Sequence, residues 1–186
     1  MEIKEQEVEG VFEIYLKPME DDRGFFMRVF DETLFENAGI NRKWVQENHS
    51  KSLRKGIIRG LHLQIPPFTE AKLVRCICGA VLDVFVDLRF GSKTFGKWGS
   101  LELSESNKNM IFIPRGFAHG FCTLTEKSEV LYKVDNYFSK ENEVGINWDD
   151  KDIGIVWSIE NPILSEKDKN NITLKAFTEK YIGIVV

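Results

Sequence analysis

One histidine stands inside a strongly strand-like stretch of the sequence. His62 lies in the segment 56–65, which is mostly apolar, and the whole chain holds only three histidines. Burying an imidazole in a sheet is costly unless the ring finds a hydrogen-bond partner. A neutral imidazole with such a partner is a good general base near neutral pH. The first hypothesis is therefore a site that abstracts a proton, although on its own His62 fits an ordinary core histidine too.

Short strands account for most of the chain around this histidine. In the segment 81–88 apolar side chains occupy alternate positions, and Asp83 and Asp87 fall on the opposite face. The segment 71–78, followed by Gly79, is predicted to pair with it as a hairpin. Further strands are expected at 11–16, 25–30, 43–48, 99–103, 110–113, 120–124 and 129–138. Many short strands with closely spaced turn signals favour a β-sandwich or barrel.

Helix is scarce in this sequence. Asp31 can cap a short helix over 32–38 that Gly39 ends. A second short helix is expected to start at Ser165. No repeat, low-complexity tract or linker divides the 186 residues, so we expect one domain spanning residues 1–186.

Composition narrows the class of protein. Charged residues make up 29% and hydrophobic residues 42%, as in soluble globular proteins. The net charge of −4 argues against a nucleic-acid partner. No apolar run approaches the roughly 18 residues of a membrane span, and the first residues lack an apolar signal-peptide region. Three cysteines, an odd number, are expected to be reduced packing residues, and we expect a cytoplasmic protein.

Five segments carry most of the remaining chemistry. They are 22–26 (Asp-Arg-Gly-Phe-Phe), 45–50 (Val-Gln-Glu-Asn-His-Ser), 59–64 (Arg-Gly-Leu-His-Leu-Gln), 113–121 (Ile-Pro-Arg-Gly-Phe-Ala-His-Gly-Phe) and 163–168 (Ile-Leu-Ser-Glu-Lys-Asp). Three shorter segments, 72–75, 131–133 and 145–150, agree with them in order and spacing. Together they resemble the dTDP-4-dehydrorhamnose 3,5-epimerase family of nucleotide-sugar enzymes. The resemblance runs from about residue 11 to residue 168, nearly the whole chain.

The resemblance implies an all-β fold, a cupin-type double-stranded β-helix (jelly roll) with a few short helices. It also implies a homodimer with no metal and no organic cofactor. The implied substrate is a nucleoside-diphosphate 4-keto-6-deoxy sugar, in the commonest case the dTDP-4-dehydro-6-deoxy-glucose that becomes dTDP-4-dehydro-rhamnose. Its C4 ketone acidifies the hydrogens on C3 and C5. A base can therefore remove one of them to give an enolate, and an acid can return a proton to the opposite face.

The resemblance assigns the catalytic roles to three residues. His62 matches the family's base, Tyr132 its acid, and Asp168 the carboxylate that pairs with the base. Each has a plainer alternative, since Tyr132 fits a core tyrosine and Asp168 can complete a capping box with Ser165. Asp83 is a second conceivable partner for His62, and the sequence alone leaves that choice open.

The resemblance also implies a set of substrate-binding positions. They are Arg23, Gln46, Asn48, Arg59, Lys72, His119, Phe138, Glu143 and Lys167. Among them, Arg59 and Lys72 match residues near the sugar and its ketone oxygen. Three residues separate Arg59 from His62, which in a regular strand puts them on opposite faces, so a bulge is expected near Gly60.

Two of these regions differ from the family's usual pattern. Phe138 stands where members often have a tyrosine against the nucleotide base. It lies six residues past Tyr132, hence on the same face of a regular strand, and keeps an aromatic plane for stacking. Arg28 replaces a glutamate of better-known members, which leaves the accepted nucleotide and sugar open.

Three other functions compete with a 3,5-epimerase. Some relatives invert only C3 or only C5. A metal-dependent cupin is suggested by Pro114, Gly116 and His119, which resemble the second cupin signature, but the first signature has Gln64 in place of a histidine. The third alternative is a sugar-binding jelly roll without catalysis.

Overall fold

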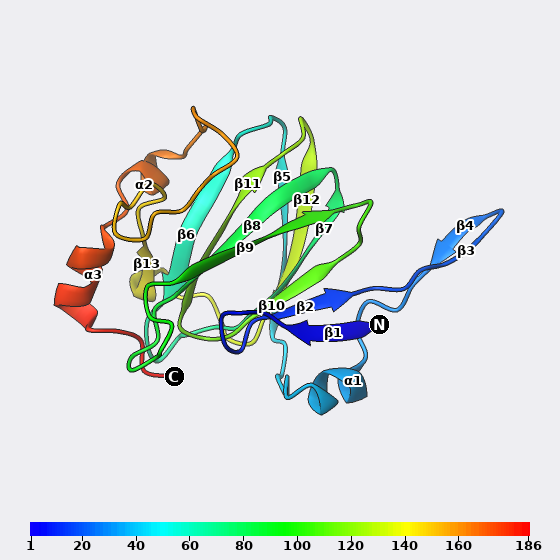
Figure 1. Cartoon of the computed structure of the whole chain (residues 1–186), viewed down its shortest axis with the longest axis horizontal. Coiled ribbons are helices and arrows are strands. Elements are labelled where there is room, and N and C mark those ends of the chain that lie inside the picture. The colour runs from blue at the N-terminus through cyan, green and yellow to red at the C-terminus, as the bar shows by residue number, and fades with distance from the viewer.

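Two antiparallel sheets face one another in the computed structural model, which describes residues 1–186 (Figure 1). One sheet has six strands in the order β1-β2-β10-β7-β12-β5, and the other has five in the order β13-β6-β11-β8-β9. The strands are β1 Glu2–Glu5, β2 Phe12–Tyr15, β3 Met19–Asp21, β4 Gly24–Phe26, β5 Gln46–Ser52, β6 Ile58–Gln64, β7 Lys72–Cys78, β8 Ala80–Asp87, β9 Trp98–Ser104, β10 Met110–Ile113, β11 Phe117–Thr123, β12 Ser128–Val134 and β13 Glu143–Gly145. The expected all-β architecture is confirmed.

Three short helices complete the fold. They are α1 Glu32–Asn37, α2 Glu166–Lys169 and α3 Leu174–Tyr181, with a 3-10 turn at Lys140–Asn142. As predicted, Asp31 caps α1 by accepting a hydrogen bond from Leu34 N. Helix α3 was not predicted; its Phe177 is fully buried and belongs to the cluster that covers the outer face of β8. No helix has the length and apolar character that crossing a membrane requires.

Both faces of β8 are therefore buried, because the sheet packs inward on its partner and outward on the C-terminal segment. Val81 and Phe85 belong to the core between the sheets, whereas Val84 and Val86 belong to the outer cluster. Asp83, on the inward face, has no exposed surface. A carboxylate buried so deeply needs a polar partner, and it finds one in the site described below.

The predicted hairpin of β7 and β8 is wrong. β7 pairs with β10 and β12 in one sheet, whereas β8 pairs with β9 and β11 in the other. The chain crosses between the sheets at Gly79, whose φ of +69° lies in the left-handed region that glycine tolerates. Alternation identifies a strand but not its partner, which is why the sequence favoured the shorter connection.

Several strand limits also differ from the prediction. The strand expected at 25–30 is only Gly24–Phe26, which forms a separate hairpin with β3. The one expected at 43–48 is shifted to Gln46–Ser52, and the one expected at 129–138 ends at Val134. β1, β3 and β13 were not predicted, being three or four residues long and, apart from β13, largely exposed.

The predicted bulge at Gly60 is confirmed by the register between β6 and β11. His62 lies opposite His119 and Arg59 opposite Phe121, so three steps along β6 match two along β11. Gly60 adopts a φ of +129°. The extra residue brings Arg59 and His62 to the same side of the sheet. In a regular strand, two residues three positions apart would point to opposite faces.

Replacing Gly60 by alanine should destabilise the fold at this bulge. A Cβ there would lie 2.6 Å from Gly120 Cα and 2.8 Å from the His119 carbonyl oxygen. Gly91→Ala is the matched control, since Gly91 has a φ of +72° and a Cβ at that position would have no atom within 4 Å. In urea unfolding, we expect Gly60→Ala to lose about 1–3 kcal/mol more than the control. Equal losses would contradict a steric cost at the strand contact.

Candidate active site

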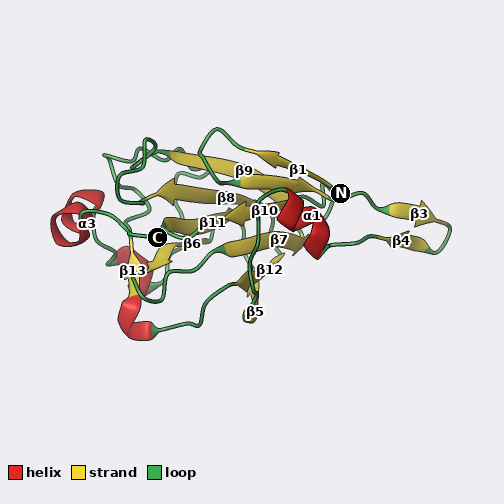
Figure 2. Cartoon of the chain, turned by 90° about the horizontal axis from the view of Figure 1, so that it is seen from below, coloured by secondary structure: helices red, strands yellow, loops and turns green.

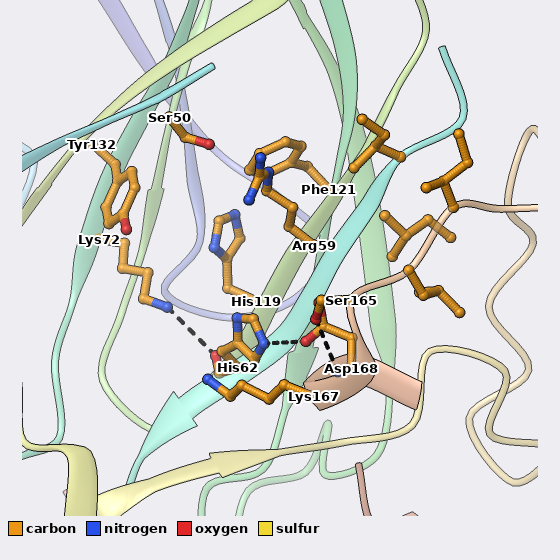
Figure 3. Close-up of a pocket in the computed structure, with 14 residues that line it drawn as sticks. Ser50, Arg59, His62, Lys72, His119, Phe121, Tyr132, Ser165, Lys167 and Asp168 are labelled. Atoms are coloured by element: carbon orange, nitrogen blue, oxygen red, sulfur yellow. Dashed lines mark hydrogen bonds and ion pairs between the residues drawn. The ribbon is translucent and has the colours of Figure 1, made fainter. Parts of the chain in front are cut away.

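A cavity of about 430 Å³ lies between the two sheets and holds most of the predicted site residues (Figure 3). Its polar lining consists of Ser50, Arg59, His62, Lys72, His119, Tyr132, Ser165, Lys167 and Asp168. A second cavity of about 130 Å³ shares His62, Lys72 and Tyr132 with the first. It adds Gln46, Asn48, Gln64, Glu70, Phe138 and Glu143. The two cavities thus meet at the residues expected to do the chemistry.

His62 and Asp168 are in close polar contact in this site. His62 Nε2 lies 2.6 Å from Asp168 Oδ1, and Asp168 is only 4% exposed. Burial alone would raise the pKa of Asp168, but the hydrogen bond and charge of His62, together with Ser165 and Lys167, lower that pKa overall. The carboxylate is therefore ionised at neutral pH and can only accept, so Nε2 donates. This leaves His62 Nδ1 with a lone pair for a proton.

The capping box that the sequence offered as an alternative role of Asp168 is only half formed, because the side chain of Asp168 contacts the Ser165 hydroxyl and not its backbone N–H. Ser165 Oγ accepts a hydrogen bond from Asp168 N at 3.1 Å and donates one to Asp168 Oδ2 at 2.9 Å. The two roles are compatible because each carboxylate oxygen serves one of them. The cap of α2 thus fixes the carboxylate that faces His62.

Asp83, the other conceivable partner of His62, belongs to a second histidine. His119 Nε2 lies 2.9 Å from Asp83 Oδ2. The other oxygen, Asp83 Oδ1, is buried and has no hydrogen-bond partner. The choice that the sequence left open is resolved in geometry: Asp168 contacts His62, and Asp83 contacts His119.

Tyr132 comes from β12 in the sheet that faces His62. It packs against the core between the sheets and also lines both cavities. The same side chain is therefore both a core tyrosine and a residue of the site. Burial raises the pKa of the Tyr132 phenol, and the negative charges of Glu70 and Glu143 raise it further, while Arg59 opposes them. The phenol therefore keeps its proton throughout the neutral range, as a general acid requires.

Cationic groups line the rest of the main cavity. Lys72 is 7% exposed, and its Nζ lies 3.4 Å from Glu70 Oε1 and 3.4 Å from the His62 carbonyl oxygen. Arg59 donates from Nε to Ser52 Oγ at 3.3 Å. Such groups suit an anionic ligand or a negative charge that develops on a ketone oxygen.

The smaller cavity is bordered by polar groups and one aromatic ring. Gln46 Oε1 accepts a hydrogen bond from Phe138 N at 2.8 Å and so fixes the backbone at that ring. Phe138 lies beyond the end of β12, so the prediction from strand parity was wrong, although the side chain does line this cavity. Asn48 lines it too, while Glu143 and Lys167 form an ion pair with each other.

Arg23 is the one predicted site residue that lies outside both cavities. It sits in the β3–β4 hairpin, which projects from the body of the molecule (Figures 1 and 2), and it pairs with its neighbour Asp21. Arg28 follows the hairpin, and its Nη1 lies 3.1 Å from Asp31 Oδ2 at the cap of α1. Within one chain, neither arginine reaches the site.

Four polar residues of the cavities were not assigned to the site from the sequence: Ser50, Gln64, Glu70 and Ser165. Glu70 had a detectable signal, because it precedes Lys72 by two residues and side chains at that spacing share a face in extended backbone. Ser50 had one too: it follows the site positions Gln46 and Asn48 at steps of two along the same strand.

The ligand set of a metal-dependent cupin is not assembled. The Gln64 amide nitrogen donates to Phe68 O, Glu70 Oε2 and Tyr137 O, and its oxygen accepts from Ser139 N. No group of three or more His, Cys, Asp or Glu side chains is placed to hold a metal ion.

Comparison with known proteins decides the family. The family model described as dTDP-4-dehydrorhamnose 3,5-epimerase matches residues 5–176. The chain belongs to this family. The dTDP-4-dehydrorhamnose 3,5-epimerase of Shigella flexneri is 49% identical over 171 residues, which are 91% of this chain and 94% of that protein.

Other members of the family extend this comparison. The crystal structure of the Legionella pneumophila dTDP-6-deoxy-D-glucose-3,5-epimerase in complex with dTDP-4-keto-L-rhamnose has a TM-score of 0.93 and 36% identity, covering 100% of this chain and 98% of that one. A dTDP-4-dehydrorhamnose 3-epimerase of Streptomyces niveus is 33% identical over 175 residues, 94% of this chain and 84% of that protein. The cupin-type jelly roll expected from the sequence is confirmed by these relationships.

Because of the contact between His62 and Asp168, the free energy of unfolding should depend on pH in the acid range. Because the pKa of Asp168 is lowered in the folded state, its contribution is complete above the unfolded value of about 4 and is lost as pH falls through the folded value. We expect Asp168→Asn to be less stable than wild type by about 1–3 kcal/mol near pH 7. That difference should shrink below about pH 4.

Urea unfolding of both proteins across this pH range measures the effect. Asp149→Asn is the control, because Asp149 is half exposed and pairs only with Lys151. A difference between wild type and Asp168→Asn that stays constant with pH would contradict the ionised contact.

Proposed function

We propose that this protein inverts C3 and C5 of dTDP-4-dehydro-6-deoxy-glucose to give dTDP-4-dehydro-rhamnose, through an enolate and without a cofactor. The observation that carries the proposal is that a histidine–carboxylate pair and a protonated phenol enter one cavity from facing sheets. Family membership supports the substrate class, since the Legionella relative is described in complex with dTDP-4-keto-L-rhamnose.

The geometry supports a simple division of roles. His62 Nδ1 removes the proton next to the C4 ketone, and the positive charge that forms on the ring is balanced by Asp168. The negative charge moves onto the ketone oxygen, where the cationic side chains of Lys72 and Arg59 stabilise it. Tyr132 then donates its proton to the carbon from the opposite side.

The remaining predicted residues suit the nucleotide part of the substrate. Lys167 supplies a hydrogen-bond donor for the diphosphate, and His119 lines the same cavity. Gln46, Asn48 and Glu143 offer polar contacts at the smaller cavity, and the Phe138 ring, 59% exposed, is free to stack on a base.

Solvent exchange tests the reaction and the two catalytic roles. In deuterated water with dTDP-4-dehydro-6-deoxy-glucose, wild type should introduce deuterium at C3 and C5, followed by NMR. His62→Asn should slow uptake at both carbons by about 100-fold to 10,000-fold, because it removes the base that is proposed to form the enolate. Tyr132→Phe should still permit exchange while depressing complete epimerisation.

Two substitutions outside the cavities serve as controls. His49→Asn removes a half-exposed histidine that pairs with Glu129, and Tyr137→Phe removes the hydroxyl of a tyrosine that is 61% exposed. Both should exchange like wild type. Wild-type uptake by His62→Asn would refute its role as the base, and no uptake by wild type with any nucleotide sugar would favour a non-catalytic sugar-binding protein.

A single-centre epimerase is the second candidate. It is favoured by the Streptomyces niveus relative, which is named a 3-epimerase. One base and one acid serve either carbon, because the C4 ketone activates both. Deuterium at C3 alone, or at C5 alone, in the same assay would identify this activity. The cytoplasmic location expected from the sequence stays a prediction.

We also propose that the protein is a homodimer in which the β3–β4 hairpin of one copy reaches the cavity of the other. A two-stranded hairpin is marginally stable by itself in water. This one exposes Met19, Phe25 and Phe26 at 64%, 55% and 62%, a cost that a second copy would remove. The expected role of Arg23 in substrate binding requires such an arrangement, because its own cavity lies out of reach.

Mixing inactive variants tests this arrangement. Arg23→Ala and His62→Asn should each be strongly impaired alone. After co-refolding in equal amounts, half of the dimers are mixed and each holds one intact site, so about a quarter of wild-type activity should return. His62→Asn mixed with Tyr132→Phe is the control and should regain nothing, because no intact site forms. No recovery in the first mixture, or a monomer by sedimentation, would overturn the proposal.

A further inference from the structure

Glu70 is a buried carboxylate at the active site that takes no part in the reaction steps proposed for His62 and Tyr132. It lies in the connection between β6 and β7, and its side chain is 13% exposed. Its two oxygens have separate partners: Oε2 accepts from Gln64 Nε2 at 2.9 Å, and Oε1 lies 3.4 Å from Lys72 Nζ. The carboxylate is therefore held between an amide and an ammonium group.

Gln64 fixes the position of Glu70. The Gln64 side chain is 3% exposed, and its oxygen accepts from Ser139 N at 2.6 Å. Its nitrogen faces three acceptors, which settles the orientation of the amide, because the reverse orientation would set donor against donor at Ser139. Glu70 Oε2 therefore accepts from an amide N–H of Gln64 whose orientation is fixed.

Lys72 depends on this carboxylate for its charge balance. Lys72 is 7% exposed, and Glu70 is the only carboxylate with which it pairs. A buried ammonium group without a counter-charge carries a large desolvation cost. Its second contact, at 3.4 Å, is to the backbone carbonyl oxygen of His62, the residue that carries the base. Glu70 thus determines where the ammonium group rests.

Glu70 also acts on Tyr132 across the smaller cavity. After burial, the charge of Glu70 is the largest cause that raises the pKa of this phenol, ahead of Glu143, and Arg59 acts in the opposite sense. The other ionisable groups that face Tyr132 from neighbouring elements are His62 on β6, Lys72 on β7, His119 on β11, and Lys167 and Asp168 on α2.

We propose that Glu70 is a positioning residue of this active site: its carboxylate holds Lys72 Nζ beside the reacting ketone and maintains a negative charge in the smaller cavity that Tyr132 also lines. The proposal rests on the proposed function for the roles of Lys72 and Tyr132. According to this proposal, Glu70 influences both Lys72 and Tyr132 without having to contact the substrate. An uncharged residue at this position would keep Tyr132 and Lys72 in the site. Lys72 would lose the carboxylate that positions it, and Tyr132 would lose the charge of Glu70.

Glu70→Gln removes the charge while keeping an oxygen that can accept from Gln64. Steady-state exchange kinetics should show kcat reduced about tenfold or more with KM changed less than about threefold, because the contact acts on the enolate rather than on the bound substrate. The phenol of Tyr132 should ionise at lower pH, because a negative charge that raises its pKa is removed. Ultraviolet titration measures this ionisation as the difference between each protein and its Tyr132→Phe counterpart, since the chain holds only four tyrosines.

Two further variants make the result decisive. Glu179→Gln makes the same chemical change at an exposed position on α3 and should match wild type in every measurement. Glu70→Asp keeps the charge but draws it back, so its kcat should fall between those of wild type and Glu70→Gln, and the decrease relative to wild type is testable even if Glu70→Gln folds poorly. Wild-type kcat in Glu70→Asp would overturn the proposal.

A purely structural role predicts a different outcome. Glu70→Gln would then lose activity only in proportion to lost folded protein, with the same pH profile and the same Tyr132 titration, and that result overturns the proposal. The titration needs no substrate. If wild type fails to exchange deuterium, the proposed function fails, while an unchanged titration in Glu70→Gln would separately refute the link between Glu70 and Tyr132.

Discussion

The site depends on one contact, the 2.6 Å hydrogen bond between His62 and Asp168, which joins residues 106 positions apart in the chain. Helix α2 is only four residues long and cannot hold a carboxylate in place by its own stability. It is anchored by its Ser165 cap, by this contact, and by the preceding segment, in which the Ile163 carbonyl oxygen accepts from Ile58 N at 3.0 Å. The base on β6 and its carboxylate are thus positioned by the same C-terminal segment.

Charge pairing divides the cavity into fixed and adjustable groups. His62, His119 and Lys72 each face a carboxylate that is largely buried, so these pairs are weakly screened and hold their geometry. Lys167 also has a carboxylate partner, but its side chain is 53% exposed, and an exposed pair separates at little cost. A diphosphate therefore finds movable cations at the rim, while the groups proposed for catalysis stay in position.

The sequence predicted correctly those features that depend only on a few neighbouring residues. The cap of α1 at Asp31 and the bulge at Gly60 follow from backbone sterics and hydrogen bonding over a few residues. It failed where the answer depends on distant packing. The strand β7 has the same alternation whether or not it pairs with β8, and β12 ends at Val134 because Gln64 and Gln46 bind the backbone that follows it. The location of Arg23 depends on the projecting hairpin, which no local pattern describes.

The number of centres inverted is decided by the shape of the cavity rather than by its acid and base. His62 and Tyr132 are carried by facing sheets, and neither backbone can follow a substrate from C3 to C5. Both carbons can meet the same pair of groups only if the sugar ring turns between two proton transfers. Ile58 and Phe121 belong to the apolar wall of the cavity in which that turn would take place. A choice made by the ring and not by the acid and base agrees with the chain being related both to 3,5-epimerases and to a 3-epimerase.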